Sequence, residues 1–225
     1  MARPIDLLSA MADEAIPIAS WSTVTEPCLV IGRSGEDTEA IEAAAVAEGL
    51  PVERRSSGGG PVLWDAGLLA LDVVLPRDHP RDSRDVVEAY RWLGEALAEG
   101  LQALGAPDVE VVAAPRARAA APRPADVACF GGLSPYEVLA DGRKVVGLSQ
   151  TRRRHGTLLQ AGVLLDLDAA RLATVLGGGE ALAADLTAAA AGLREWLPGI
   201  DPDGVAAAVD PVLARALDPE ATSAR

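Results

Sequence analysis

A glycine-rich segment has residue types that could bind an anion or a carbonyl group. Residues 54–60 read RRSSGGG, so three successive glycines follow paired arginines and paired serines. Glycines lack side chains and adopt positive φ readily, which lets backbone N–H groups approach a ligand closely. Such a loop suits a phosphate, a carboxylate or an acyl carbonyl, and a flexible turn between two strands is the alternative. Its glycine spacing matches neither the dinucleotide-binding fingerprint nor a Walker A loop.

The only lysine of the chain is a second candidate for chemistry. Lys144 is the single lysine among 20 basic residues, the others being arginine. A compact ammonium reaches a phosphate or carbonyl oxygen in a way that a guanidinium cannot, so a lysine kept in an arginine-biased chain is a candidate functional residue. Strand alternation puts Lys144 on the same face as Val146, so it either snorkels at a sheet edge or points into a site. Gly147 predicts that a ligand passes close to this strand.

A cysteine fifteen residues before the lysine is a possible nucleophile. The Cys129 thiol could accept an acyl group as a thioester, and a neighbouring cation such as Lys144 would favour the thiolate. Because Cys129 lies between alanine and phenylalanine, a small buried hydrophobic residue is the alternative. Cys28 lies in an apolar run, and we expect it to be structural.

Composition excludes several classes of function. The net charge of −13 argues against a nucleic acid partner, because a phosphate backbone requires a basic surface. No apolar run reaches the ~18–20 residues that span a membrane. The first residues lack a signal-peptide pattern and two cysteines suit a reducing compartment, so we expect a cytoplasmic protein. The two histidines have no partners at metal-ligand spacing, so no metal site is expected.

Hydrophobic periodicity and turn signals predict the strands that must position these residues. Strands are predicted at 28–31, 51–55, 61–63, 68–75, 136–140, 143–150 and about 158–167, with 68–75 in a central position. The Asp141-Gly142 pair predicts a tight hairpin turn between two of them.

Helices are predicted at 36–48, at 82–104 as the longest one, and from 168 onward. Ile41, Ala45 and Val46 are expected on the buried side of the first of these. Residues 1–26 are expected to form a helical turn and then a loop, and 114–126 a mobile loop. Strands with interspersed helices indicate an α+β fold around a mixed β-sheet flanked by helices, with residues 1–225 as one domain.

Two of these segments together resemble a known family. Residues 54–62 (RRSSGGGPV) and 142–150 (GRKVVGLSQ), in this order and spacing, resemble the biotin/lipoate protein ligase superfamily, in its lipoate–protein ligase A-like branch with the related octanoyltransferases. The resemblance covers roughly residues 20–176. It implies a catalytic domain of the class II aminoacyl-tRNA synthetase/biotin synthetase-like fold with an acyl tunnel, without the separate C-terminal accessory domain of many members.

The resemblance also implies roles for the residues singled out above. The implied substrate- and nucleotide-binding residues are Arg55, Ser57, Gly58, Gly59, Gly60 and Gly147. Lys144 would contact the acyl carbonyl and the phosphate, and a cation at that place is worth about 3–4 kcal/mol by analogy with oxyanion-hole donors. Cys129 stands where some octanoyltransferases carry a catalytic cysteine. Trp64 and Ala161 stand where many members have histidine.

The implied function is attachment of lipoate or octanoate to a lysine of a lipoyl carrier domain, either a 2-oxoacid dehydrogenase E2 or a glycine cleavage H protein. The triple glycine favours a lipoate–protein ligase, which uses ATP with Mg. The first alternative is an octanoyl or lipoyl transferase that works through Cys129 and needs no cofactor. The second alternative is a degenerate member that binds an acyl group or a nucleotide without catalysis.

Overall fold

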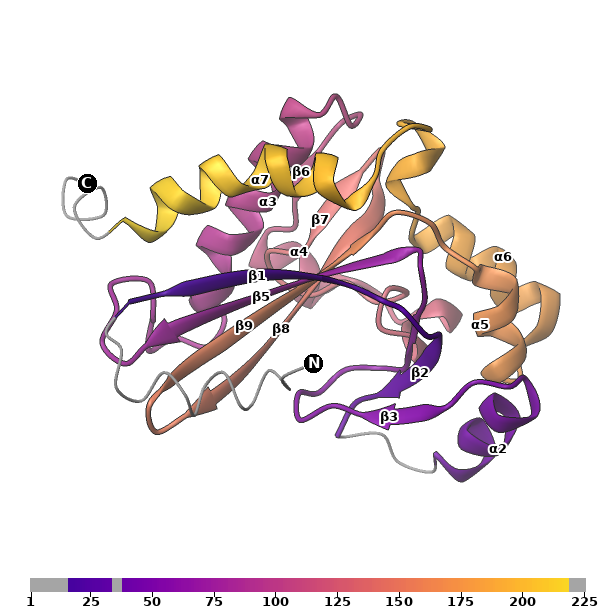
Figure 1. The fold of residues 1–225 in the computed structure, drawn as a ribbon. Helices are drawn as coiled ribbons and strands as arrows, with labels where there is room; N and C mark the ends of the chain where they lie inside the picture. Colours follow the sequence, from indigo (N-terminus) through magenta and orange to yellow (C-terminus); the bar gives the residue numbers. More distant parts are fainter. Residues whose placement is uncertain (1–15, 34–37, 219–225) are drawn as a thin grey trace.

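The computed structural model describes residues 16–33 and 38–218, which form two β-sheets with helices around them (Figure 1). The larger sheet has the strand order β1-β5-β9-β8-β7-β6, with antiparallel neighbours throughout. Its strands are β1 (Ile18–Thr23), β5 (Leu68–Pro76), β6 (Glu110–Val111), β7 (Val138–Ala140), β8 (Arg143–Arg153) and β9 (Gly156–Leu164). In the smaller sheet, β2 (Cys28–Ile31) pairs in parallel with β3 (Val52–Arg54) and antiparallel with β4 (Val62–Trp64).

The predicted strands and the hairpin are confirmed. Strand β5 pairs with β1 on one side and β9 on the other, as expected for a central strand of apolar residues. Asp141 and Gly142 both have positive φ, 47° and 73°, which is the backbone of the tight turn that this pair favours. The turn brings β7 and β8 together and places the start of β8, which carries Lys144, in the interior of the molecule.

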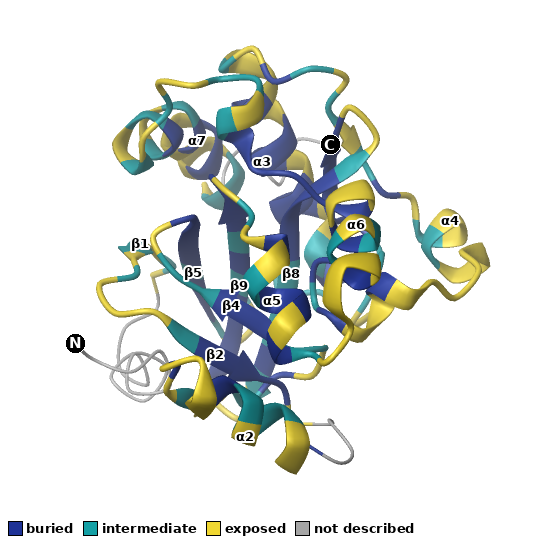
Figure 2. Cartoon of the chain, turned by 90° about the vertical axis from the view of Figure 1, so that its right-hand side faces the viewer, coloured by how far each residue is buried: buried dark blue, intermediate teal, exposed yellow. Residues whose placement is uncertain are grey.

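Two helices cover one face of the larger sheet. On α3 (Arg91–Ala103), Leu93, Leu97 and Leu101 recur at helical spacing and are fully buried. They pack with Val205 and Val209 of α7 (Pro202–Leu217) and with the alternate residues of β5 and β9 that point to this side. Figure 2 shows buried surface along these strands and on the inward sides of α3 and α7. This core fixes one face of the sheet and leaves its other face to the smaller sheet.

Four further α-helices complete the described fold: α2 (Glu39–Ala47), α4 (Ala114–Ala119), α5 (Ala169–Val175) and α6 (Gly179–Ala189). Of these, α2, α5 and α6 pack around the smaller sheet. Leu172 of α5 and Leu186 of α6 belong to the same buried cluster as Leu29 of β2. Helical structure after residue 168 is therefore confirmed. No described helix is long and apolar enough to cross a lipid bilayer.

The helix predicted at 82–104 is shorter than its hydrophobic spacing indicates. Helix α3 begins at Arg91 after a 3₁₀ turn at Glu88–Tyr90, and the longest described helix is α7. The carboxylate of Asp85 accepts hydrogen bonds from the backbone N–H groups of Val87 and Glu88, at 2.8 and 3.2 Å. This local alternative to helical hydrogen bonding explains why the apolar periodicity at 82–90 does not extend the helix.

Three other local predictions are wrong. The N-terminal loop contains strand β1, which completes the edge of the sheet against β5, whereas the predicted helical turn before it lies in residues 1–15, outside the described residues. The predicted loop at 114–126 contains α4 and a 3₁₀ turn at Pro124–Val127, because alanines and prolines in the first turn support short helices. Val46 on α2 is 68 % exposed, whereas Ala45 is buried. The predicted start of that helix at residue 36 also lies outside the described residues.

Candidate functional site

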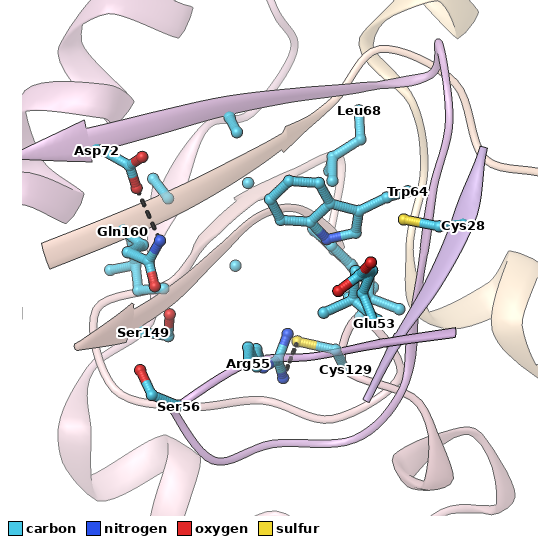
Figure 3. A pocket seen from close by; sticks show the side chains of 18 of the residues that line it. Cys28, Glu53, Arg55, Ser56, Trp64, Leu68, Asp72, Cys129, Ser149 and Gln160 are labelled. Atoms are coloured by element: carbon cyan, nitrogen blue, oxygen red, sulfur yellow. Dashed lines mark hydrogen bonds between the residues drawn. The ribbon is translucent and has the colours of Figure 1, made fainter. Parts of the chain in front are cut away.

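A pocket of about 340 Å³ lies between the two sheets, on the face of the larger sheet that points away from α3 (Figure 3). Strands β5, β8 and β9 form its floor, the smaller sheet and the start of the RRSSGGG segment lie opposite, and Cys129 and Phe130 close one side. The lining is mostly apolar: Val30, Val62, Trp64, Leu68, Ala70, Phe130, Leu148 and Leu158 all contribute to it. A pocket of this size and lining suits an acyl chain.

Small residues on the floor make room for an aromatic ring. Strand register aligns Gly147 of β8 with Gly162 of β9 and then with Ala70 of β5. A Cβ atom at Gly147 or at Gly162 would lie 3.4 Å from Cζ of Phe130. Gly147 lines the pocket, and the groups that approach it closely are the ring of Phe130 and Cε of Lys144, whereas its role in ligand binding stays a prediction.

The next cross-strand row on the floor is polar. Asp72 of β5 pairs with Gln160 of β9, which pairs with Ser149 of β8. Nε2 of Gln160 donates a hydrogen bond of 2.7 Å to Oδ1 of Asp72. Burial raises the pKa of the Asp72 carboxyl, and the hydrogen bond from Gln160 offsets part of this. Both side chains line the pocket.

The raised pKa of Asp72 gives a measurable pH dependence of stability. Between its unfolded-state pKa and its higher folded-state pKa, the folded protein binds more protons than the unfolded chain, so the stability contributed by Asp72 falls as pH rises. Asp72→Asn keeps an acceptor for Gln160 and removes the titration. We therefore expect the free energy of unfolding of this variant, minus that of the unmodified protein, to be larger at about pH 7 than at about pH 4. Urea unfolding of both proteins at the two pH values measures their free energies of unfolding. A difference between the two proteins that is the same at both pH values would contradict a raised pKa of Asp72.

The glycine-rich segment encloses the side chain of its own second arginine. Arg55 donates to the carbonyl oxygen of Gly58 from Nε and Nη2, at 3.2 and 2.9 Å, and to that of Gly60 from Nη2, at 3.1 Å. Gly59 has φ +102°, and a Cβ atom there would lie 2.6 Å from Nη2 of Arg55, so only glycine fits at this position. Contrary to the expected use of backbone N–H groups, carbonyl oxygens point into the loop and hold a cation.

The serines of this segment have different surroundings. Ser56 lines the pocket, and its hydroxyl lies 3.2 Å from that of Thr151. Ser57 is 4 % exposed, and its hydroxyl has no hydrogen-bond partner among the described residues. It is absent from the described lining of the pocket, so its predicted binding role stays a prediction.

The Cys129 thiol lies at the pocket wall beside the guanidinium of Arg55. The distance from Nη2 of Arg55 to Sγ of Cys129 is 3.7 Å, and the backbone N–H of Cys129 donates to the carbonyl of Pro61 at 2.9 Å. Cys28 also lines the pocket, but burial and the charge of Glu53 raise the pKa of its thiol. The two thiols therefore differ in what surrounds them.

Lys144 is buried behind this wall and is not among the described residues that line the pocket. It is 1 % exposed, and Nζ lies 2.7 Å from Oε1 of Glu137. Nζ also donates to the carbonyl oxygens of Cys129 and Gly132, at 2.8 and 3.0 Å. Three acceptors thus take the three hydrogens of the ammonium group. Neither alternative from the sequence, an edge position or a side chain that points into the site, describes this buried ion pair.

Glu137 is the site residue that sequence reasoning missed. It is 2 % exposed, and besides Lys144 it accepts hydrogen bonds from the backbone N–H groups of Ser134 at 2.7 Å and Leu148 at 3.4 Å. Burial raises the pKa of its carboxyl, and Lys144 opposes this shift. The sequence signal is an acidic residue directly before the apolar run 138–140, across the hairpin turn from the lone lysine.

Comparisons with known proteins identify the family of the chain. The model of the lipoyl protein ligase A/B catalytic domain matches residues 5–210. Octanoyltransferase LipM of Kyrpidia tusciae is 41 % identical over 160 residues, which are 67 % of this chain and 55 % of that protein. Octanoyltransferase LipM of Staphylococcus aureus is 35 % identical over 159 residues, 69 % of this chain and 56 % of that protein. The chain thus spans little more than half the length of these curated relatives.

Solved structures share the fold. A structure of lipoate-protein ligase A bound with ATP superposes with a TM-score of 0.67 at 21 % identity, covering 93 % of this chain and 80 % of that one. The bi-partite lipoate protein ligase of Thermoplasma acidophilum gives 0.68 at 21 % identity, covering 94 % and 79 %. The α+β class is confirmed, with the mixed pairing confined to the smaller sheet. Because the family match extends over most of its length, the chain belongs to the lipoyl protein ligase A/B catalytic domain family, and the resemblance drawn from the two sequence segments is confirmed.

Proposed function

We propose that this chain transfers a medium-chain acyl group, with octanoyl as the reference case, from a thioester donor to a lysine of a lipoyl carrier domain through a thioester on Cys129. The observation that carries the proposal is the Cys129 thiol at the wall of an apolar pocket, 3.7 Å from the Arg55 guanidinium. The apolar lining suits the chain of an acyl group, and the thiol supplies a nucleophile for its carbonyl. Relatives named octanoyltransferase support the same reaction.

The reaction consists of two acyl transfers. In the first, the Cys129 thiolate attacks the donor carbonyl, a thioester forms on Sγ, and the donor sulfur leaves as a thiol after taking a proton. In the second, the amine of the acceptor lysine attacks this thioester, an amide forms, the amine loses a proton and Cys129 leaves as a thiolate. Arg55 faces the sulfur atom that bears negative charge at the start of the first transfer and at the end of the second.

Lys144 supports this site from behind. Its hydrogen bonds to the carbonyl oxygens of Cys129 and Gly132 fix the segment that presents the thiol. A direct contact between Nζ and an acyl carbonyl requires Nζ to leave one of its three acceptors. The role of Lys144 as a catalytic residue therefore stays a prediction, and its role as a positioning residue rests on these contacts.

ATP-dependent ligation has less support from the residues at the site. Arg54 pairs with Glu42 and donates a hydrogen bond of 2.9 Å to Thr38. Arg55 binds two carbonyl groups of its own loop. Both arginines of the glycine-rich segment are therefore already engaged by groups of the protein itself, which favours the thioester route.

The test supplies each donor separately. The protein is incubated with an apo lipoyl domain and either an octanoyl carrier-protein thioester without ATP, or octanoate with ATP and Mg, and products are read by intact mass. We expect an octanoylated lipoyl domain and an octanoylated enzyme with the thioester donor alone. Product only with octanoate and ATP would identify a ligase, and no product with either donor would leave a binding protein. Either result would overturn the proposal.

The contact between Arg55 and sulfur predicts a rate effect. Arg55→Gln removes the positive charge while leaving donors for the loop carbonyls, so acylation of Cys129 should slow by about 10- to 100-fold. The adjacent variant Arg54→Gln should slow it much less, because Arg54 pairs with Glu42 away from the thiol. Single-turnover acylation followed by mass spectrometry measures both rates. Equal effects of the two substitutions would contradict a specific role of Arg55.

A further inference from the structure

The polar row on the pocket floor is unexpected in an acyl pocket. Directly paired residues of neighbouring strands point to the same face, so Asp72, Gln160 and Ser149 face the pocket side by side. This row lies two residues along the strands from Gly147 and Gly162, which corresponds to about 6–7 Å. Figure 3 shows the three polar side chains on one side of the pocket, and Cys129 with Arg55 on another.

The row has hydrogen-bonding capacity that the described residues do not use. The side chains of Asp72 and Gln160 make one described hydrogen bond, and it joins them to each other. Oδ2 of Asp72, Oε1 of Gln160 and the second amide hydrogen of Gln160 have no partner among the described residues. A polar group that faces an apolar ligand loses its bonds to water without replacement, which is unfavourable. A plain alkyl chain across this row would leave these atoms unsatisfied.

We propose that Asp72, Gln160 and Ser149 form a hydrogen-bonding subsite for a hydroxyl group carried on the acyl chain, several carbons from the thioester. The proposal rests on the acyl transfer proposed above and specifies the class of acyl group: medium-chain hydroxyacyl groups are preferred over plain alkyl chains of the same length.

A hydroxyl group fits the free atoms of the row better than a charged group. It donates to Oδ2 of Asp72 and accepts from the free amide hydrogen of Gln160, so both partners are used at once. A carboxylate on the chain would meet the like charge of Asp72. An ammonium group would have to lose its water inside a mostly apolar lining.

The experiment compares donors that differ by one oxygen atom. The full protein is mixed with octanoyl-pantetheine or with one of a series of hydroxyoctanoyl-pantetheines. The series places the hydroxyl group at successive carbons in the outer half of the chain. The rate of acylation of Cys129 is measured by intact mass under single-turnover conditions. We expect one hydroxyl position to react at least about tenfold faster than octanoyl at low donor concentration, since one well-placed hydrogen bond to a charged group is worth about this much.

Two variants test whether a preference for the hydroxyacyl donor comes from the row of Asp72, Gln160 and Ser149. Asp72→Leu should abolish the difference between the two donors, because it removes the acceptor that the hydroxyl group would use. Ser20→Ala is the matched control, because Ser20 pairs with Asp72 at the outer end of the same row but is exposed and not among the described residues that line the pocket. It should keep the full preference. Calorimetric binding of octanoate and of the matching hydroxyoctanoate to Cys129→Ala gives a second measure that needs no chemistry.

The outcomes separate this proposal from the one on which it rests. Acylation by octanoyl without preference at any hydroxyl position would overturn the subsite and keep the transferase. A preference for the hydroxyacyl donor that persists in Asp72→Leu would also overturn the subsite, because the preference would then come from other residues. Absence of acylation with every donor would overturn the transferase, and equal binding of the two acids by Cys129→Ala would then overturn the subsite independently.

Discussion

Replacing Lys144 by methionine is expected to lower the free energy of unfolding by about 3–5 kcal/mol, the usual cost of removing one partner of a buried ion pair. Methionine has a similar length, so the loss comes from the charge rather than from a cavity. Glu137, which is 2 % exposed, would keep a carboxylate without its cation. The carbonyl groups of Cys129 and Gly132 would also lose their donor. Urea unfolding followed by tryptophan fluorescence measures the change.

Two further variants show where this energy comes from. Adding Glu137→Gln to Lys144→Met removes the unpaired charge, so the double variant should regain much of the lost stability. Arg143→Met is the matched control on the preceding residue of the same strand. Arg143 pairs with Glu195, whose side chain is 51 % exposed, and an exposed pair contributes about 0–1 kcal/mol. A loss below about 1 kcal/mol for Lys144→Met would contradict the importance of the buried pair.

The sequence identified Lys144 but not its surroundings. Its rarity and its place after the Asp141-Gly142 turn are local features, and the structure confirms the turn. Its partner Glu137 lies directly before the other strand of the hairpin, and the strand register pairs Lys144 with Leu139, so counting across the turn does not pair the two charged residues. Burial of both side chains depends on how the segment from Cys129 to Gly132 folds over β8, which no local pattern reveals.

The glycine-rich segment shows a similar limit. Residues 54–56 line the pocket, and the carbonyl groups of Gly58 and Gly60 hold Arg55 beside Cys129. Its orientation could not be predicted, because three flexible glycines allow either carbonyl or N–H groups to point inward. Arg55 decides this by binding the carbonyls. The contact with sulfur joins residues 74 positions apart in the chain.

The fold was more predictable than the site because strands depend on local apolar patterns. Strand β5 follows directly from the run 68–75, and strands β8 and β9 follow from the segments near 143–150 and 158–167. The polar row of the floor arises only from the register between three strands, so Asp72 and Gln160 carry no joint signal in the sequence. At this row, the register between the strands is what the sequence left undetermined.

Two cations contact different atoms of Cys129, and this arrangement separates the chemistry proposed for its thiol from the contacts that hold its backbone. Arg55 lies 3.7 Å from the sulfur atom, whereas Nζ of Lys144 lies 2.8 Å from the carbonyl oxygen of the same residue. The first contact acts on the reacting atom and the second on the backbone that holds it. Removal of the thiol therefore removes the chemistry and leaves the supporting contacts, which involve backbone atoms, in place.

Cys129→Ala is accordingly expected to fold normally and to lose acyl transfer from a thioester donor by about 10³-fold or more, the scale seen when a nucleophile is removed. Its enzyme-bound octanoyl adduct should be absent from intact mass spectra. Cys28→Ala, in contrast, should still form the adduct, because burial and Glu53 disfavour the thiolate of Cys28. An adduct that persists in Cys129→Ala and disappears in Cys28→Ala would place the nucleophile on β2 instead. A transfer rate unchanged in both variants would show that the acyl group passes to the acceptor lysine without a thioester on either cysteine.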